Sequence, residues 1–166
     1  MISKERVEKM LQEEITKARS AGIPIGKYIN SKIDFPKAKS FYGQCVPKGD
    51  RFQIRISEYF LTSTEFDIRM TLMHELIHTC PDCLNHGYEW RKWVAVANNQ
   101  FGYRISRITN HEKSMAECYQ EYTGENRIRS AYKYKITCSK CGKEYYRTRR
   151  TNVTEHTSDY GCGRCG

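Results

Sequence analysis

The chain has 166 residues, of which 39% are hydrophobic and 28% charged, and its formal net charge is +9 at pH 7. This composition supports a packed core and excludes a chain that is disordered throughout. The length fits one ordinary domain, or one domain with a small appendage. No run of about 18 apolar residues occurs, and the charged start MISKERVEKM lacks the apolar centre of a signal peptide, so we expect a cytoplasmic protein without a membrane span.

The positive charge favours an anionic partner, with nucleic acid as the first candidate. The alternative is that the charge only keeps the protein soluble.

The first part of the chain predicts a helix followed by loops and a strand. Residues 4–20 place apolar side chains on one helical face, and Gly22 and Pro24 end the pattern. Residues 23–50 carry Gly, Pro and Asp at intervals, which is typical of loops with short strands. The stretch RFQIRIS, residues 51–57, alternates polar and apolar residues and predicts a strand.

A second helix is predicted to begin at Thr62, which forms a capping box with Glu65, and to end before Pro81. A third helix runs from about Gly87 to Asn99. We interpret residues 101–108 as a strand and residues 115–122 as a short helix.

The second helix carries the motif HELIH. His74 and His78 lie one turn apart, so both imidazoles face one zinc ion, and Glu75 is placed to act on water without ligating the metal. The alternative is that these are polar residues on a helix surface.

A third ligand is needed for an open, catalytic zinc site. His86 follows the turn TCPDCLN and is the main candidate, while Glu89, Glu112 and Glu117 are weaker ones. With three histidines, Glu75 would take a proton from water as general base and return it to the leaving amine. A tyrosine or arginine would have to stabilise the oxyanion, but the sequence does not choose one.

A second metal site is predicted from Cys138, Cys141, Cys162 and Cys165, which form a C-x2-C-x20-C-x2-C pattern. Four thiolates close a tetrahedral structural zinc site, and zinc would stabilise a segment too small to fold alone. We expect a short hairpin between the two pairs.

The remaining cysteines have weaker signals. Cys80 and Cys83 are interpreted as residues that pack and turn the loop, with a redox or metal-modulating pair as the alternative. Cys45 and Cys118 are interpreted as ordinary buried thiols.

Basic and aromatic residues cluster in the last segment, where residues 133–166 contain eight Lys and Arg against three acidic residues. Basic groups engage phosphates and tyrosines stack on bases. The candidate nucleic-acid contacts are Tyr145, Tyr146, Arg147, Arg149 and Arg150. A solvated basic hairpin is the alternative.

Taken together, HELIH, HGYEW and the upstream SEYFL resemble the SprT family of zinc metalloproteases, most specifically over residues 57–93. The resemblance extends over most of the chain, because members often end in a zinc ribbon. One departure is the short loop between His78 and His86, which holds CPDC where many members have a longer, cysteine-free connection.

The resemblance implies an α+β fold, with a minigluzincin-like core of helices packed on a small sheet (residues 1–130) and a four-cysteine zinc ribbon (residues 131–166). It also implies His74, His78 and His86 as ligands and Glu75 as the catalytic glutamate. Eukaryotic relatives cut proteins crosslinked to DNA, and some bacterial relatives are described as regulators.

These observations predict a zinc metallopeptidase that holds two zinc ions, one catalytic and one structural, and acts on DNA-associated proteins. The alternative is a regulatory protein that binds nucleic acid and has a weak or inactive zinc site.

Overall fold

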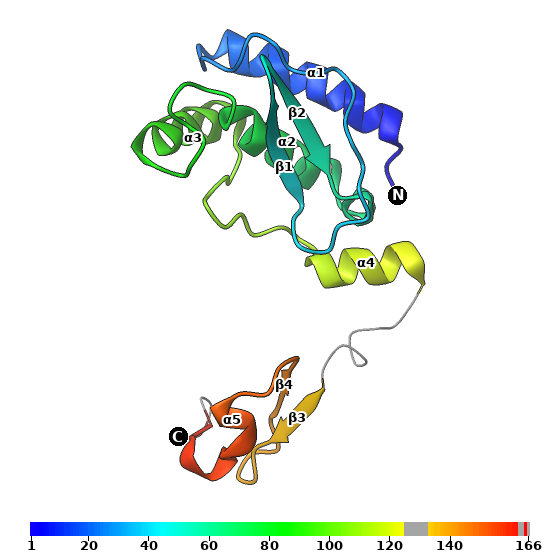
Figure 1. Ribbon diagram of the computed structural model, residues 1–166, viewed down its shortest axis with the longest axis vertical. Helices are drawn as coiled ribbons and strands as arrows, with labels where there is room; N and C mark the ends of the chain where they lie inside the picture. The colour runs from blue at the N-terminus through cyan, green and yellow to red at the C-terminus, as the bar shows by residue number, and fades with distance from the viewer. Residues whose placement is uncertain (125–132, 163–164, 166) are drawn as a thin grey trace. The chain divides into compact units, whose positions relative to one another are not determined.

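The computed structural model describes residues 1–124, 133–162 and 165. The chain divides into two compact units, residues 1–123 and 124–166, here called the core unit and the ribbon unit (Figure 1). The boundary predicted between residues 130 and 131 lies outside the described residues. No helix in the described ranges is long and apolar enough to cross a membrane.

The predicted α+β class is confirmed, because the helices accompany two small antiparallel sheets. The core unit contains α1 (Lys4–Ser20), β1 (Gly43–Lys48), β2 (Arg51–Ile56), a 3-10 helix (Glu58–Thr62), α2 (Glu65–Ile77), α3 (Tyr88–Phe101) and α4 (Met115–Thr123). The ribbon unit contains β3 (Tyr134–Thr137), β4 (Glu144–Arg147), α5 (Asn152–Glu155) and a 3-10 helix (Thr157–Asp159).

The strands β1 and β2 form an antiparallel hairpin that crosses α2 in Figure 1. Gly49 closes the turn with a φ of 62°, a conformation that glycine adopts without strain. On the side away from β1, β2 forms isolated bridges with Ile29 and Asp34. Within the described residues β1 has only β2 as a neighbour, so it is an edge strand.

The helix α2 begins later than the sequence predicted. Its N-cap is Thr64, whose hydroxyl accepts a hydrogen bond from the amide of Asp67 at 3.1 Å. The prediction of Thr62 was wrong because Thr62 ends the preceding 3-10 helix, where its hydroxyl donates to the carbonyl of Tyr59.

Apolar residues surround α2, which lies between two core clusters. Toward α1 and β2 it contributes Ile68, Leu72 and Leu76. Toward α3 it contributes Met70, Met73 and Ile77. A helix that is apolar on opposite faces is expected to be buried between layers, and this burial fixes the position of the HELIH motif.

The segment after α3 is not the predicted strand. Gly102 ends α3 in the left-handed conformation, with a φ of 67°. The side chain of Asn98 then pairs with both the amide and the carbonyl of Ile105, each at 2.9 Å. This side chain satisfies the backbone groups that a neighbouring strand would otherwise pair with.

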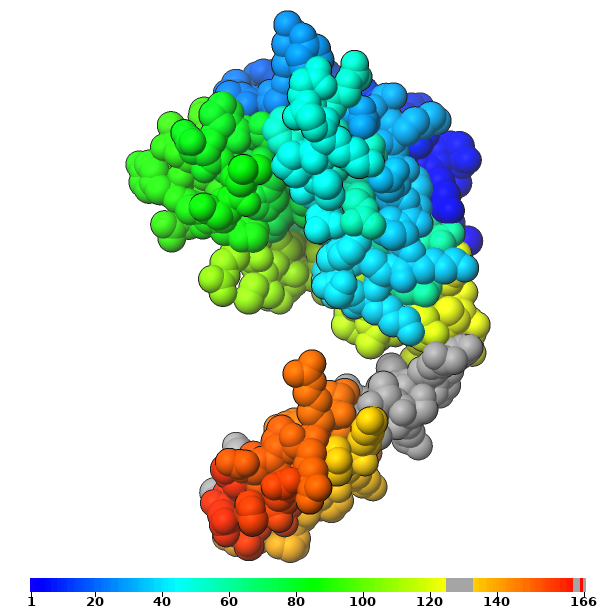
Figure 2. Space-filling view, viewed as in Figure 1, coloured from blue at the N-terminus to red at the C-terminus, as the bar shows by residue number. Residues whose placement is uncertain are grey.

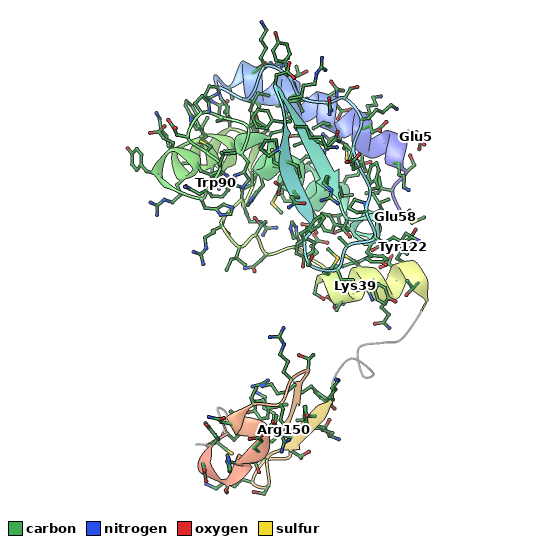
Figure 3. The ribbon with its side chains drawn as sticks, viewed as in Figure 1. Glu5, Lys39, Glu58, Trp90, Tyr122 and Arg150 are labelled. Carbon is green, nitrogen blue, oxygen red and sulfur yellow. The ribbon has the colours of Figure 1, made fainter. Side chains whose placement is uncertain are left out.

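The helix α4 docks on the 3-10 helix through polar and aromatic contacts. The carboxylate of Glu58 forms an ion pair with Lys4 at 2.8 Å, and the ring of Tyr122 packs edge-on against that of Tyr59, with centres 5.3 Å apart. Lys39 lies 3.8 Å from the ring centre of Tyr119. Figure 3 labels Glu58, Tyr122 and Lys39 at this junction.

A buried carboxylate joins α1 to α2. The side chain of Glu14 is fully buried and accepts hydrogen bonds from Lys17 and Arg69 at 2.8 Å and from Tyr103 at 2.7 Å. A buried charge requires such partners, so this network ties the two helices to the segment after α3.

In the ribbon unit, the hairpin differs from the one predicted. β4 pairs with β3, which precedes the first cysteine pair, so the hairpin encloses that pair instead of lying between the two. The turn is closed by hydrogen bonds from Cys138 N to Lys143 O and from Gly142 N to Cys138 O, both 2.9 Å. The residues that were predicted as the hairpin therefore include β4 and, after it, the short helix α5.

Candidate metal centre and active site

Three imidazoles meet at the C-terminal end of α2. His74 and His78 come from its last turn, and His86 comes from the loop before α3. The Nε2 atom of His86 lies 3.1 Å from that of His74 and 3.2 Å from that of His78. Ligands at about 2.0–2.1 Å from a tetrahedral zinc ion are about 3.3 Å apart, so the three nitrogens fit one ion.

The loop between the histidines orients His78. Its Nδ1 donates a hydrogen bond to the carbonyl of Cys83 at 2.7 Å, which leaves the Nε2 lone pair to face the other imidazoles. The loop turns back sharply because Asp82 has a φ of 58° and the amide of Cys83 bonds the carbonyl of Cys80 at 3.2 Å. The short CPDC connection therefore supports the ligand geometry.

The indole of Trp90 packs against all three imidazoles, with ring centres 4.9 Å from His74, 5.6 Å from His78 and 4.5 Å from His86. Figure 3 labels Trp90 on α3. Burial lowers the pKa of each of these histidines, for His74 to about 3. All three are thus neutral at pH 7, which is the form that binds metal.

The glutamates considered as third ligands do not join this group. Among the described residues, the metal-binding group contains His86 and excludes Glu89, Glu112 and Glu117. Glu89 instead forms an ion pair with Lys92 at 3.5 Å, and Glu117 accepts a hydrogen bond from Ser114.

Glu75 lies beside the imidazoles but outside the ligand group, and its side chain is almost fully buried. Burial raises the pKa of this carboxyl to about 8, while a hydrogen bond from the backbone amide of Cys45 acts in the opposite direction. Cys45 belongs to β1, so the edge strand lies beside this carboxyl.

Gly43, at the start of β1, approaches α2 so closely that no side chain fits. A Cβ atom there would lie 2.5 Å from Cγ2 of Thr71 and 3.0 Å from Cγ of Glu75. Sequence analysis missed this position, since a glycine before a strand carries no signal of what it contacts.

Two cavities adjoin Glu75. The first has a volume of about 290 Å³ and is lined by His74, Glu75, His78 and His86, together with Leu84 and residues 43–45 of β1. The second has a volume of about 250 Å³ and also reaches His74 and Glu75, with Phe41, Tyr42, Gly43, Thr71, Arg107, Ile108, Thr109 and His111 as its other lining residues. In Figure 2 the atoms of the β1 segment, in cyan, adjoin the green atoms of residues 80–100 on the face shown.

His111 was also missed by sequence analysis. Its side chain is buried between Tyr42 and Phe60, with ring centres 4.4 and 4.9 Å away. Its Nδ1 lies 3.4 Å from the carboxylate of Asp67, and its Nε2 lies 3.4 Å from the hydroxyl of Thr71. An isolated histidine in a loop gives no sequence pattern that would link it to HELIH.

The ribbon unit brings its four cysteines together. The Sγ atoms of Cys138 and Cys165 are 3.6 Å apart, and those of Cys141 and Cys162 are 3.7 Å apart. Zinc–sulfur bonds of about 2.3 Å place tetrahedral ligands about 3.8 Å apart, so four thiolates fit one ion.

The aromatic and basic residues of the ribbon unit have different surroundings. The hydroxyl of Tyr145 lies 3.0 Å from Sγ of Cys162, and Tyr146 bonds Glu144. Arg147 bonds its neighbouring carbonyl, Arg149 is exposed, and Arg150 forms an ion pair with Glu155.

The other cysteines of the core unit fall into two kinds. Cys80, Cys83 and Cys118 are buried, and burial raises the pKa of their thiols, which favours a packing role for the CPDC pair over a redox role. The interpretation of Cys45 as a buried thiol was wrong, because it is half-buried and lines the cavity beside Glu75.

The α+β core thus holds three converging histidines next to a buried glutamate, an arrangement that is typical of zinc peptidases. The sequence pattern of the SprT-like family matches residues 11–117, and the chain belongs to this family. Comparisons with curated proteins and with solved structures gave no match.

The two ligand groups predict two zinc ions per chain. His86→Ala should lose one ion and keep the other, and the double change Cys141→Ser, Cys165→Ser should do the reverse, because each group needs its ligands. Metal analysis by mass spectrometry after dialysis measures this, with His156→Ala, which lies outside both groups, as the matched control. Two ions in the His86→Ala protein would contradict the three-histidine site.

Gly43→Ala should lower the free energy of unfolding by about 1–3 kcal/mol, because the added methyl overlaps Thr71. Adding Thr71→Ser, which removes Cγ2, should restore more than half of the loss. Urea denaturation of both single variants and the double variant measures the coupling. Strictly additive effects would show that the contact is not the cause.

Proposed function

We propose that this protein is a zinc-dependent metallopeptidase that acts on proteins bound or crosslinked to DNA. The observation that carries the proposal is the placement of Glu75 beside three converging imidazoles, at the wall of a cavity that a substrate can enter. Membership of a metalloprotease-like family supports the same class of reaction.

Zinc, when bound, supplies a Lewis acid that polarises the carbonyl group of the substrate. Glu75 takes a proton from water as the water oxygen adds to the carbonyl carbon. Glu75 then delivers that proton to the amide nitrogen as the carbon–nitrogen bond breaks. The edge strand packs against Glu75 at Gly43 and so limits the movement of this side chain during both transfers.

The edge strand β1 offers a way to hold the substrate. Its residues 43–45 line the cavity that contains Glu75, and β1 is unpaired on one edge within the described residues. An extended peptide that adds to this edge would pair its backbone with β1 and lay a peptide bond beside Glu75.

The charge of the ribbon unit supports a DNA-directed role. Its eight Lys and Arg against three acidic residues in 133–166 favour phosphate binding. The cavity of about 570 Å³ in this unit is lined by Tyr145, Arg147 and Tyr160 among others, residue types that stack on bases and contact phosphates.

Glu75→Gln should lower kcat/KM for cleavage of a protein attached to DNA by between about 100-fold and 10,000-fold, because the amide cannot accept the proton. Zinc content should stay at the wild-type level, since Glu75 is not in the ligand group. The matched control is Glu89→Gln, at a half-buried glutamate near His86 that forms an ion pair with Lys92.

Unchanged cleavage by the Glu75→Gln protein would contradict the assignment of the general base. A wild-type protein that binds DNA and zinc but cleaves no protein on DNA would favour the alternative, a nucleic-acid-binding regulatory protein with an inactive site.

Changing Arg147, Arg149 and Arg150 together to Ala should weaken DNA binding and reduce the slope of log affinity against log salt by about 2 for single-stranded DNA, because about three phosphate contacts are lost. A salt titration by fluorescence anisotropy measures the slope. The matched control removes three positive charges from the core unit, at Lys27, Lys48 and Arg51. Equal slopes for wild type and the ribbon variant would exclude the ribbon arginines from DNA binding.

A further inference from the structure

Peptide hydrolysis needs a hydrogen-bond donor for the negative charge that develops on the carbonyl oxygen. The donor must reach the space beside Glu75 and the metal ligands. The 250 Å³ cavity, which contacts both His74 and Glu75, holds five further polar side chains: Tyr42, Thr71, Arg107, Thr109 and His111.

The side chain of His111 faces Thr71 on one side and Asp67 on the other. Nδ1 of His111 faces the Asp67 carboxylate, and its Nε2 faces the hydroxyl of Thr71, each at 3.4 Å. Burial lowers the pKa of His111, so the ring is neutral and carries one proton, which the nearby carboxylate draws to Nδ1. His111 therefore presents an acceptor, not a donor, on the side of Thr71.

Two more side chains are held by the backbone. The hydroxyl of Tyr42 lies 3.0 Å from the amide of Met115, at the start of α4. The hydroxyl of Thr109 donates to the carbonyl of Ser106 at 3.0 Å and accepts from its amide at 3.3 Å. These bonds fix the segments that carry both residues; the Tyr42 oxygen accepts from the amide, so that bond does not use its own proton.

Arg107 differs from all four. Within the described part of the chain its guanidinium has no ion pair or hydrogen bond, although it lines the cavity with His74 and Glu75. The hydrogen-bonded turn from Ser106 to Thr109 fixes the backbone on which it stands.

The geometry points to Arg107 as a catalytic residue that donates hydrogen bonds to the carbonyl oxygen of the substrate as it becomes an oxyanion, an assignment that rests on the proposed function. A guanidinium is always charged and offers five N–H donors, so it serves an oxyanion without having to gain a proton.

The test compares Arg107→Met with Arg104→Met. Arg104 stands three residues earlier on the same segment, lies 5.9 Å from the ring centre of Phe66 and does not line the cavity, so it is a matched control. Each zinc-loaded protein is titrated with two peptides of one sequence. One carries a phosphinate, which mimics the tetrahedral intermediate, and the other a hydroxamate, which binds metal without that shape. Calorimetry or the fluorescence of Trp90, which packs on all three histidines, reports binding.

We expect Arg107→Met to weaken phosphinate binding by about 100-fold and to lower kcat by a similar factor, with KM and hydroxamate binding changed less than about threefold. Thermal stability should stay at the wild-type level, because no ion pair or hydrogen bond of Arg107 within the described residues is lost. Arg107→Lys should recover part of the phosphinate affinity, and Arg104→Met should match wild type.

Equal phosphinate affinities for wild type and Arg107→Met would overturn this assignment and leave the proposed function intact. A second result would also overturn it: a rise in KM alone, seen with peptides that have a free C-terminal carboxylate and not with amidated peptides. Arg107 would then bind the peptide terminus and not the oxyanion. A wild-type protein that binds zinc but no phosphinate would overturn the proposed function and this assignment together.

Discussion

The close contact between β1 and α2 at Gly43 is the constraint on which the candidate site depends. Because Gly43 has no side chain, the edge strand lies directly against α2, where a Cβ atom at this position would be 2.5 Å from Cγ2 of Thr71 and 3.0 Å from Cγ of Glu75. The same approach places an unpaired strand edge along the cavity that contains the imidazoles. One close contact thus packs the strand against the proposed general base and shapes the surface that a peptide would meet.

Burial has opposite effects on the two kinds of ionisable group at this site. It lowers the pKa of the three histidines, which keeps their lone pairs available, and it raises the pKa of Glu75. A cation bound by the imidazoles would favour the charged carboxylate next to them, so the metal and the general base support each other. The indole of Trp90 and the carbonyl of Cys83 hold the rings in position without adding charge.

The two units reach their structures by different physical means. The core unit buries apolar side chains on opposite faces of α2 and satisfies one buried carboxylate, Glu14, with three donors. The ribbon unit has no buried residue in α5 and gathers four cysteines instead. Its folding is therefore expected to depend on metal, whereas that of the core unit depends on hydrophobic burial.

The sequence by itself determined the features whose causes are local: the helical spacing that brings His74 and His78 to one face, and the two cysteine pairs of the ribbon unit. The α+β class followed from the resemblance of its motifs to the SprT family. Its predictions were wrong where another group took the hydrogen bonds of the expected element. Thr62 belongs to the preceding 3-10 helix, and the side chain of Asn98 bonds the backbone of Ile105. Only the tertiary structure decided which residues line the cavities beside Glu75, namely Gly43, Cys45, His111 and Arg107. These come from segments before and after α2 in the chain, and contacts between distant segments leave no periodic signal in a single sequence.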